Sequence, residues 1–137
     1  MLADECRRRF ATADHVYLAT AGADGGPHLV PVVVVVTGDE ICFAVDDKPK
    51  RTTSLRRLRN IAENPRVAFL ADHYDADWSR LWWVRADAEA RVLRDGAERE
   101  RAVEALRLRH RQYRHQDLAG PVVLARVMRW SGWAASP

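Results

Sequence analysis

The run from His28 to Val36 constrains the fold most, because it is almost wholly apolar and most of its residues are valine. β-Branched residues favour strands, and a strand without polar alternation is expected to be buried on both faces. Turn residues flank the run, so strands over 15–21, 28–36 and 41–45 are predicted to form a meander. Pro31 lacks the N–H that a sheet ladder uses, so we expect a bulge or a sheet edge at that position.

The remaining segments predict three helices and three more strands, without the regular strand–helix–strand order of a parallel sheet. The helices are expected over 2–12, from the cap residues 52–54 to 63, and over 98–113, and the strands over 66–73, 81–93 and 122–133. Six antiparallel strands with small helices at their ends are typical of a barrel. We therefore expect a mainly β fold, a six-stranded antiparallel β-barrel, with residues 1–137 forming a single domain.

Composition argues against several classes of protein. The formal net charge of +3 is mild for a domain that binds duplex nucleic acid, which usually carries a dense stripe of Lys and Arg. No run reaches the roughly 18 apolar residues of a membrane span, and the first residues do not resemble a signal peptide. Cys6 and Cys42 lie outside any metal-binding or redox motif. We expect a cytoplasmic protein that has no metal site and binds neither nucleic acid nor membrane.

The densest group of cations surrounds the start of the second predicted helix. Its members are Lys48, Lys50, Arg51, Arg56 and Arg57. The free N–H groups and the dipole of a helix start attract anions, and the hydroxyl group of Thr52 adds a donor there. This arrangement predicts a cradle for a phosphate group. The alternative is a solvated basic loop that Asp46 and Asp47 partly neutralise.

Three tryptophans lie close together at the start of the fifth predicted strand. Trp82 and Trp83 are adjacent, so on a strand their side chains point to opposite faces. One ring is expected to fill the core, and the other to line a groove or a subunit interface. Trp78 lies just before the strand, where its ring can stack on a planar ligand. The alternative is that all three rings serve packing alone.

No motif identifies a catalytic side chain. The sequence contains no nucleophile elbow, no P-loop and no dinucleotide-binding glycine fingerprint. His110 and His115 are five residues apart, which does not place them together on one helix face, and we expect them to be solvated. If the protein is an enzyme, a bound cofactor is expected to carry the reaction.

Three segments, taken in order, resemble the pyridoxamine 5'-phosphate oxidase-like superfamily of split β-barrels. They are Gly26–Val32, which resembles its second strand, Phe43–Arg51, which leads into a basic loop, and Asn60–Ala68, which contains Asn-Pro-Arg-Val. The resemblance covers roughly residues 10–95 and, more loosely, the last strand. Asp46–Lys50 and residues 75–85 further resemble an actinobacterial branch that uses the deazaflavin coenzyme F-420.

The resemblance implies an FMN-binding-like split barrel that forms a homodimer, with the cofactor in a cleft between the subunits. It implies phosphate contacts from Lys48, Lys50, Arg51 and Arg57 with Thr52 or Arg56 assisting, a ring system against Pro31 and Val32, and a ring contact from Trp83. Trp78 is the candidate for the substrate, and no catalytic residue is assigned. The expected activity is hydride transfer between coenzyme F-420 and an unidentified small organic substrate.

Departures from the family pattern leave other functions open. Leu55-Arg56-Arg57 stands where the oxidases usually have Ser-Arg-Lys, which argues against true pyridoxamine-phosphate oxidase activity. Ala88 replaces a glycine that many relatives carry in the late strand. One alternative is an FMN-binding oxidase or reductase of the same fold. Others are a non-catalytic cofactor- or haem-binding module and, through the arginines of the second helix, nucleic-acid binding.

Overall fold

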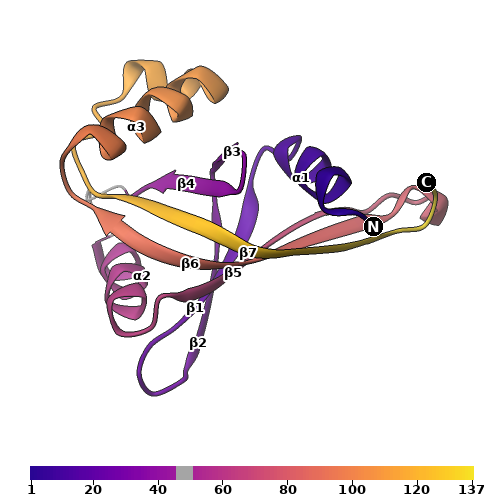
Figure 1. Ribbon diagram of the computed structural model, residues 1–137, viewed down its shortest axis with the longest axis horizontal. Helices are drawn as coiled ribbons and strands as arrows, with labels where there is room; N and C mark the ends of the chain where they lie inside the picture. Colours follow the sequence, from indigo (N-terminus) through magenta and orange to yellow (C-terminus); the bar gives the residue numbers. More distant parts are fainter. Residues whose placement is uncertain (46–50) are drawn as a thin grey trace.

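The structure, a computed structural model, describes residues 1–45 and 51–137, with only the backbone of residues 51–55. Within these residues seven strands form one antiparallel sheet in the order β2-β1-β5-β6-β7-β4-β3 (Figure 1). The strands are β1 (Val16–Ala21), β2 (Pro27–Val32), β3 (Val35–Thr37), β4 (Glu40–Ala44), β5 (Arg66–His73), β6 (Trp82–Leu93) and β7 (Val122–Ala134). The predicted mainly β class and antiparallel split-barrel fold are confirmed.

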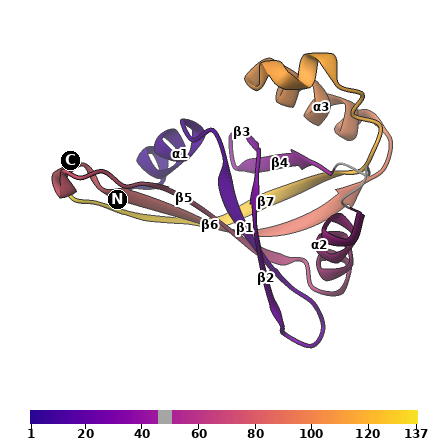
Figure 2. The same cartoon turned by 180° about the vertical axis from the view of Figure 1, so that it is seen from behind.

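Three α-helices and two short 3-10 helices complete the described part of the chain. They are α1 (Ala3–Ala11), α2 (Arg51–Glu63), α3 (Ala97–Arg109), η1 (Trp78–Arg80) and η2 (Arg111–His115). Helices α1 and α3 lie on one side of the long β6–β7 pair, and α2 lies on the other side (Figures 1 and 2). Among the described helices, none is long and apolar enough to cross a membrane.

The predicted strand 28–36 is two strands, which accounts for the seventh strand. β2 pairs with β1 at one edge of the sheet, and β3 pairs with β4 at the other edge. Val33 and Val34 carry the chain between the two edges. Pro31 therefore lies on an edge strand, as predicted. The expected burial of both faces is wrong for β2, because the described chain leaves Leu29 68% exposed.

Aromatic side chains organise the core between the sheet and α1. Phe69 packs edge-on against Phe10 and Phe43, with ring centroids 6.4 and 6.2 Å apart. All three rings are buried, and each contributes roughly 1.5–3 kcal/mol by leaving water. Trp82 packs against this core while Trp83 lines the opposite face of the sheet. The prediction that these two rings face opposite sides is confirmed.

Candidate functional site

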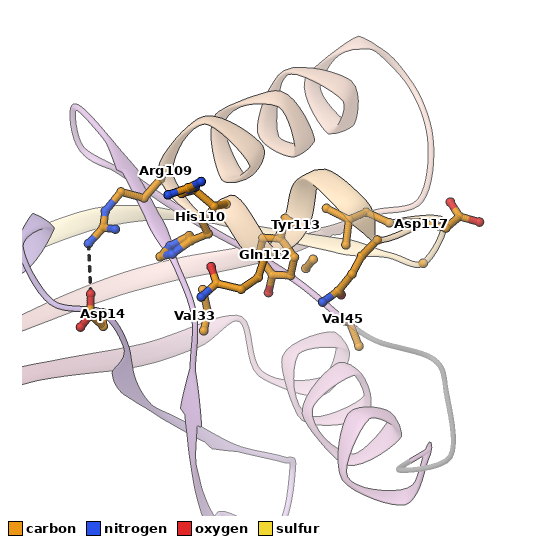
Figure 3. Close-up of a pocket in the computed structure, with 13 residues that line it drawn as sticks. Asp14, Val33, Val45, Arg109, His110, Gln112, Tyr113 and Asp117 are labelled. Carbon is orange, nitrogen blue, oxygen red and sulfur yellow. Dashed lines mark ion pairs between the residues drawn. The ribbon is translucent and has the colours of Figure 1, made fainter.

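A cleft of about 740 Å³ lies where η2 passes over the crossing between β2 and β3. Val33, Ala44 and Val45 line one wall, and His110 and Tyr113 line the other. Figure 3 shows these walls between α3 on one side and α2 on the other. The volume lies within the range of about 300–1,000 Å³ that is usual for small-molecule and cofactor sites.

The valine wall follows from the way the sheet splits. Val33 belongs to the crossing segment, so its side chain is not covered by a neighbouring strand and remains half-buried. Val45 follows the last residue of β4, and its backbone N–H donates to the carbonyl of Pro121 at 2.9 Å. This wall therefore offers an apolar surface to a planar ligand.

The opposite wall begins where α3 ends. The backbone of His110 is extended (φ −123°, ψ 108°), so the predicted helix 98–113 stops at Arg109 and continues as η2. His110 is only 8% exposed, and its Nε2 lies 2.7 Å from the carbonyl oxygen of Val34. The expectation that His110 is solvated is therefore wrong. The ring of Tyr113 packs edge-on against the His110 ring, with centroids 6.0 Å apart.

Two arginines fasten η2 and the segment after it to α3. Arg107 donates from Nε to the carbonyl of Tyr113 at 3.2 Å and from Nη2 to the carbonyl of Gln116 at 3.1 Å. Arg99 is buried and donates to the carbonyl of Gly120 at 2.8 Å, and also to that of Leu118. These charge-assisted bonds hold the wall of the cleft in one position.

An ion pair marks the rim of the cleft. Arg109 Nη2 lies 3.9 Å from Asp14 Oδ1 (Figure 3), and the same nitrogen donates to the carbonyl of Ala13 at 3.2 Å. The contact joins the end of α3 to the loop before β1. Asp14 is fully solvated, so the pair contributes little to stability.

Arg57 connects the cleft to α2. Its side chain is half-buried, because α2 packs against β1 and β6. Burial lowers the pKa of the Arg57 guanidinium, and its interaction with Tyr113 opposes this shift. Arg57 therefore links α2, which carries the predicted phosphate site, to Tyr113 in the cleft wall. Arg56 is exposed.

His28 on β2 forms a cluster with Arg56 and Arg57 of α2. Its Nδ1 is buried without a hydrogen-bond partner among the described residues. Burial lowers the pKa of His28, and the positive charges of Arg56 and Arg57 lower it further. An anion held between these side chains would give the buried nitrogen a partner and reduce the repulsion. This cluster therefore fits a phosphate group.

His28 was not predicted as a site residue, although the sequence carried a signal. The period of two along β2 places His28 on the same face as Val30 and Val32. A histidine on an inward face requires a polar partner. What the sequence did not show is that α2 brings two arginines to that position.

The predicted site residues do not form one group. Lys48 and Lys50 lie outside the described residues, as do the side chains of Arg51 and Thr52. Val32 is only 6% exposed and belongs to the core. Of the predicted residues with described side chains, only Arg56 and Arg57 lie at the His28 cluster.

Pro31 and Trp83 lie on the outer face of the sheet. Trp83 lines an open groove of about 800 Å³ together with Tyr17, Leu29 and Leu70. Pro31 pairs with Tyr17 across β2 and β1. Alternation places the side chains of this pair on that same face. The outer face is therefore mostly apolar, with Asp72 and Arg85 also lining the groove, and it is not covered by the described residues.

Trp78 is remote from the α2 end of the molecule. It belongs to η1, in the connection between β5 and β6, and is 76% exposed. This connection lies near the chain termini, at the end of the long hairpin opposite to α2 (Figure 1).

The described residues also contain no group of three or more side chains suited to a metal ion.

The match to a protein family extends along almost the whole chain. The family described as pyridoxamine 5'-phosphate oxidase matches residues 2–133. The chain belongs to this family. No curated protein sequence matches the chain.

Solved structures similar to this family member have the same fold. The protein Rv2991 of Mycobacterium tuberculosis is 23% identical over 98% of this chain and 86% of that one, with a TM-score of 0.74. A FAD-binding protein of Mycobacterium smegmatis is 21% identical over 97% and 96% of the two chains, with a TM-score of 0.69. A FAD-binding protein of Mesorhizobium loti is 18% identical over 96% and 94%, with a TM-score of 0.73.

Proposed function

We propose that this protein is an oxidoreductase that binds the deazaflavin coenzyme F-420 and transfers a hydride between it and a small organic substrate. The observation that carries the proposal is the cluster of His28, Arg56 and Arg57, in which Arg57 interacts with Tyr113 in the wall of a cofactor-sized cleft. The phosphate-bearing tail belongs at this cluster, and the ring belongs in the cleft.

The cluster has the chemistry that a phosphate group requires. Arg57 is half-buried, so its charge is only partly screened by water. A guanidinium group presents a planar fork of donors that matches phosphate oxygens. Lys48, Lys50, Arg51 and Thr52 would extend this positive surface along the tail. A long acidic tail uses such a surface more fully than a single phosphate, which favours coenzyme F-420 over FMN.

The cleft suits a tricyclic ring. Val33 and Val45 supply an apolar wall, and Tyr113 faces them (Figure 3). When bound there, the ring would supply the hydride chemistry. The residues of the chain would orient it, exclude water from one of its faces, and hold its tail at Arg57.

A second copy of the chain is the proposed cover of the outer-face groove. Tyr17, Leu29, Leu70 and Trp83 form an apolar surface there, and Leu29 is 68% exposed. Surfaces of this kind mark binding or association sites. In a homodimer Pro31 and Trp83 would be buried between the subunits, whereas the family resemblance implies that both contact the ring of the cofactor.

Flavin binding is the alternative that the relatives favour. Two of the similar structures are named as FAD-binding proteins. Flavins share the tricyclic ring and a phosphate-bearing tail with the deazaflavin, so the same cleft and the same cluster would hold them. The choice between the two therefore depends on a measurement of relative affinity.

Equilibrium titration of the apo-protein with coenzyme F-420, FMN and FAD tests the proposal. Tryptophan fluorescence provides the signal, and calorimetry gives each dissociation constant. We expect the tightest binding for coenzyme F-420. Preference for FMN or FAD would overturn the deazaflavin assignment and make the protein a flavin enzyme, and binding of none would overturn the whole proposal.

A further inference from the structure

We propose that His110 is a positioning residue whose Nδ1 accepts a hydrogen bond from the imide N–H of the ring, so that the imide edge faces η2. The inference rests on the proposed function and adds an orientation for the ligand. The tail would lie toward Arg57 and His28, and the imide toward the end of α3.

The contact with Val34 determines the tautomer of His110. A carbonyl oxygen can only accept a hydrogen bond, so the Nε2 that lies 2.7 Å from it carries the proton. The neutral imidazole then has its lone pair on Nδ1. No hydrogen bond to this Nδ1 is formed within the described residues. His110 lines the cleft, where a ligand can supply the missing donor.

The His110 ring is held before any ligand binds. It is 8% exposed and packed between the Val34 carbonyl and the edge of Tyr113. Arg107 fastens Tyr113 to α3 through the Tyr113 carbonyl. An acceptor whose position is already determined costs little conformational entropy when a ligand binds.

The lone pair on Nδ1, and not the charges around it, selects an N–H donor over an anion at this position. Arg109 precedes His110 and is engaged by Asp14 and the Ala13 carbonyl, while the exposed Arg111 follows it. Among the other residues that line the cleft, Val33 and Val45 are apolar, and Asp14 and Asp117 carry carboxylates. A neutral lone pair repels phosphate and carboxylate oxygens and attracts N–H groups. In an oxidised flavin or deazaflavin ring, the imide is the ring group whose N–H donates a hydrogen bond.

The substitution H110Q tests the roles of the two ring nitrogens separately. The amide of glutamine can still donate to the Val34 carbonyl, but it has no acceptor in the place of Nδ1. H115Q is the matched control, because His115 lies in the same turn and is exposed. The ligands are the deazaflavin riboside without the phosphate tail, its N3-methyl derivative, and coenzyme F-420.

We expect H110Q to weaken coenzyme and riboside binding by roughly threefold to tenfold, the effect of one neutral hydrogen bond. The N3-methyl riboside should bind the wild type as weakly as the riboside binds H110Q. Its affinity for H110Q should be no lower than its affinity for the wild type. H115Q should bind like the wild type. Equal affinities of H110Q and wild type for coenzyme F-420 would overturn the inference.

Nitrogen NMR gives a readout that a merely structural role would not change. In the free protein the His110 ring should show a protonated Nε2 and an unprotonated Nδ1. Addition of coenzyme F-420 should shift the Nδ1 resonance and leave the Nε2 proton in place. If the coenzyme binds and the Nδ1 resonance does not shift, the role of His110 is rejected and the proposed function stands. Failure of the coenzyme to bind would reject the proposed function as well.

Discussion

Asn60 donates a hydrogen bond from Nδ2 to the Oγ1 of Thr20 at 3.1 Å, and both side chains are buried. The bond joins α2 to β1. Thr20 is also the residue of β1 that pairs with His28 of β2. The contact therefore sets the position of α2, with Arg56 and Arg57, relative to His28.

Loss of this contact should destabilise the protein. N60L should lower the free energy of unfolding by about 1–3 kcal/mol, because it leaves the buried Thr20 hydroxyl without its partner. Denaturant unfolding measures the change. In a double-mutant cycle with T20V, the stability losses of the two single variants should sum to more than the loss measured in the variant that carries both substitutions. Strict additivity would show that the two residues are not coupled.

Removal of the Arg57 guanidinium should weaken cofactor binding while the fold survives. R57A is expected to cost about 1–3 kcal/mol of coenzyme affinity, as for a hydrogen bond to a charged group. R59A is the matched control, because Arg59 is exposed on the same helix and is not among the charges that act on His28. Calorimetric titration of the two variants should separate them. Equal affinities would place the tail away from this part of α2.

His28 should make anion binding depend on pH. Its pKa is lowered from 6.5 in the free protein, and a bound anion would raise it again. Binding should therefore be accompanied by proton uptake, and affinity for a phosphodiester such as coenzyme F-420 should increase as the pH falls through the window between these two pKa values. Calorimetry in buffers of different ionisation enthalpy measures the uptake. H28Q should remove it, and the same uptake in that variant would assign the proton to another group.

The same lowered pKa affects folding in the absence of ligand. The unfolded chain binds a proton at His28 more readily than the folded chain does, so this residue favours the folded state above about pH 6.5. That contribution should be lost as the pH falls below the unfolded pKa toward the folded one. Denaturant unfolding of wild type and H28Q at pH 7.5 and at lower pH should show a smaller acid loss in the variant. An identical loss would show that other groups cause the acid sensitivity.

Disruption of the outer-face groove should abolish the proposed homodimer. L29K places a charge among Tyr17, Leu70 and Trp83, where a second copy is expected to pack. L108K is the control, because Leu108 is a similarly exposed leucine on α3 (72%, compared with 68% for Leu29) and is not part of the groove. Sedimentation velocity should show a dimer for wild type and L108K and a monomer for L29K. A dimeric L29K would place the interface elsewhere.

Local patterns in the sequence were sufficient for most of the secondary structure. The period of the apolar residues predicted β5 over Arg66–His73 and the opposite faces of Trp82 and Trp83. The motif residues around Asn-Pro-Arg-Val predicted the family. These features depend on neighbours along the chain, so the sequence alone contains them.

The tertiary structure decided where distant segments meet. The valine run that the sequence presents as one strand divides at Val33, because its two ends pair with opposite edges of the sheet. His110 is buried where its Nε2 meets the carbonyl oxygen of Val34, which is far away in the sequence. Arg57 and His28 form a cluster only because α2 packs across β1. The sequence by itself determined the elements and the family, whereas pairing between remote strands, which no local period encodes, determined the cleft and its chemistry.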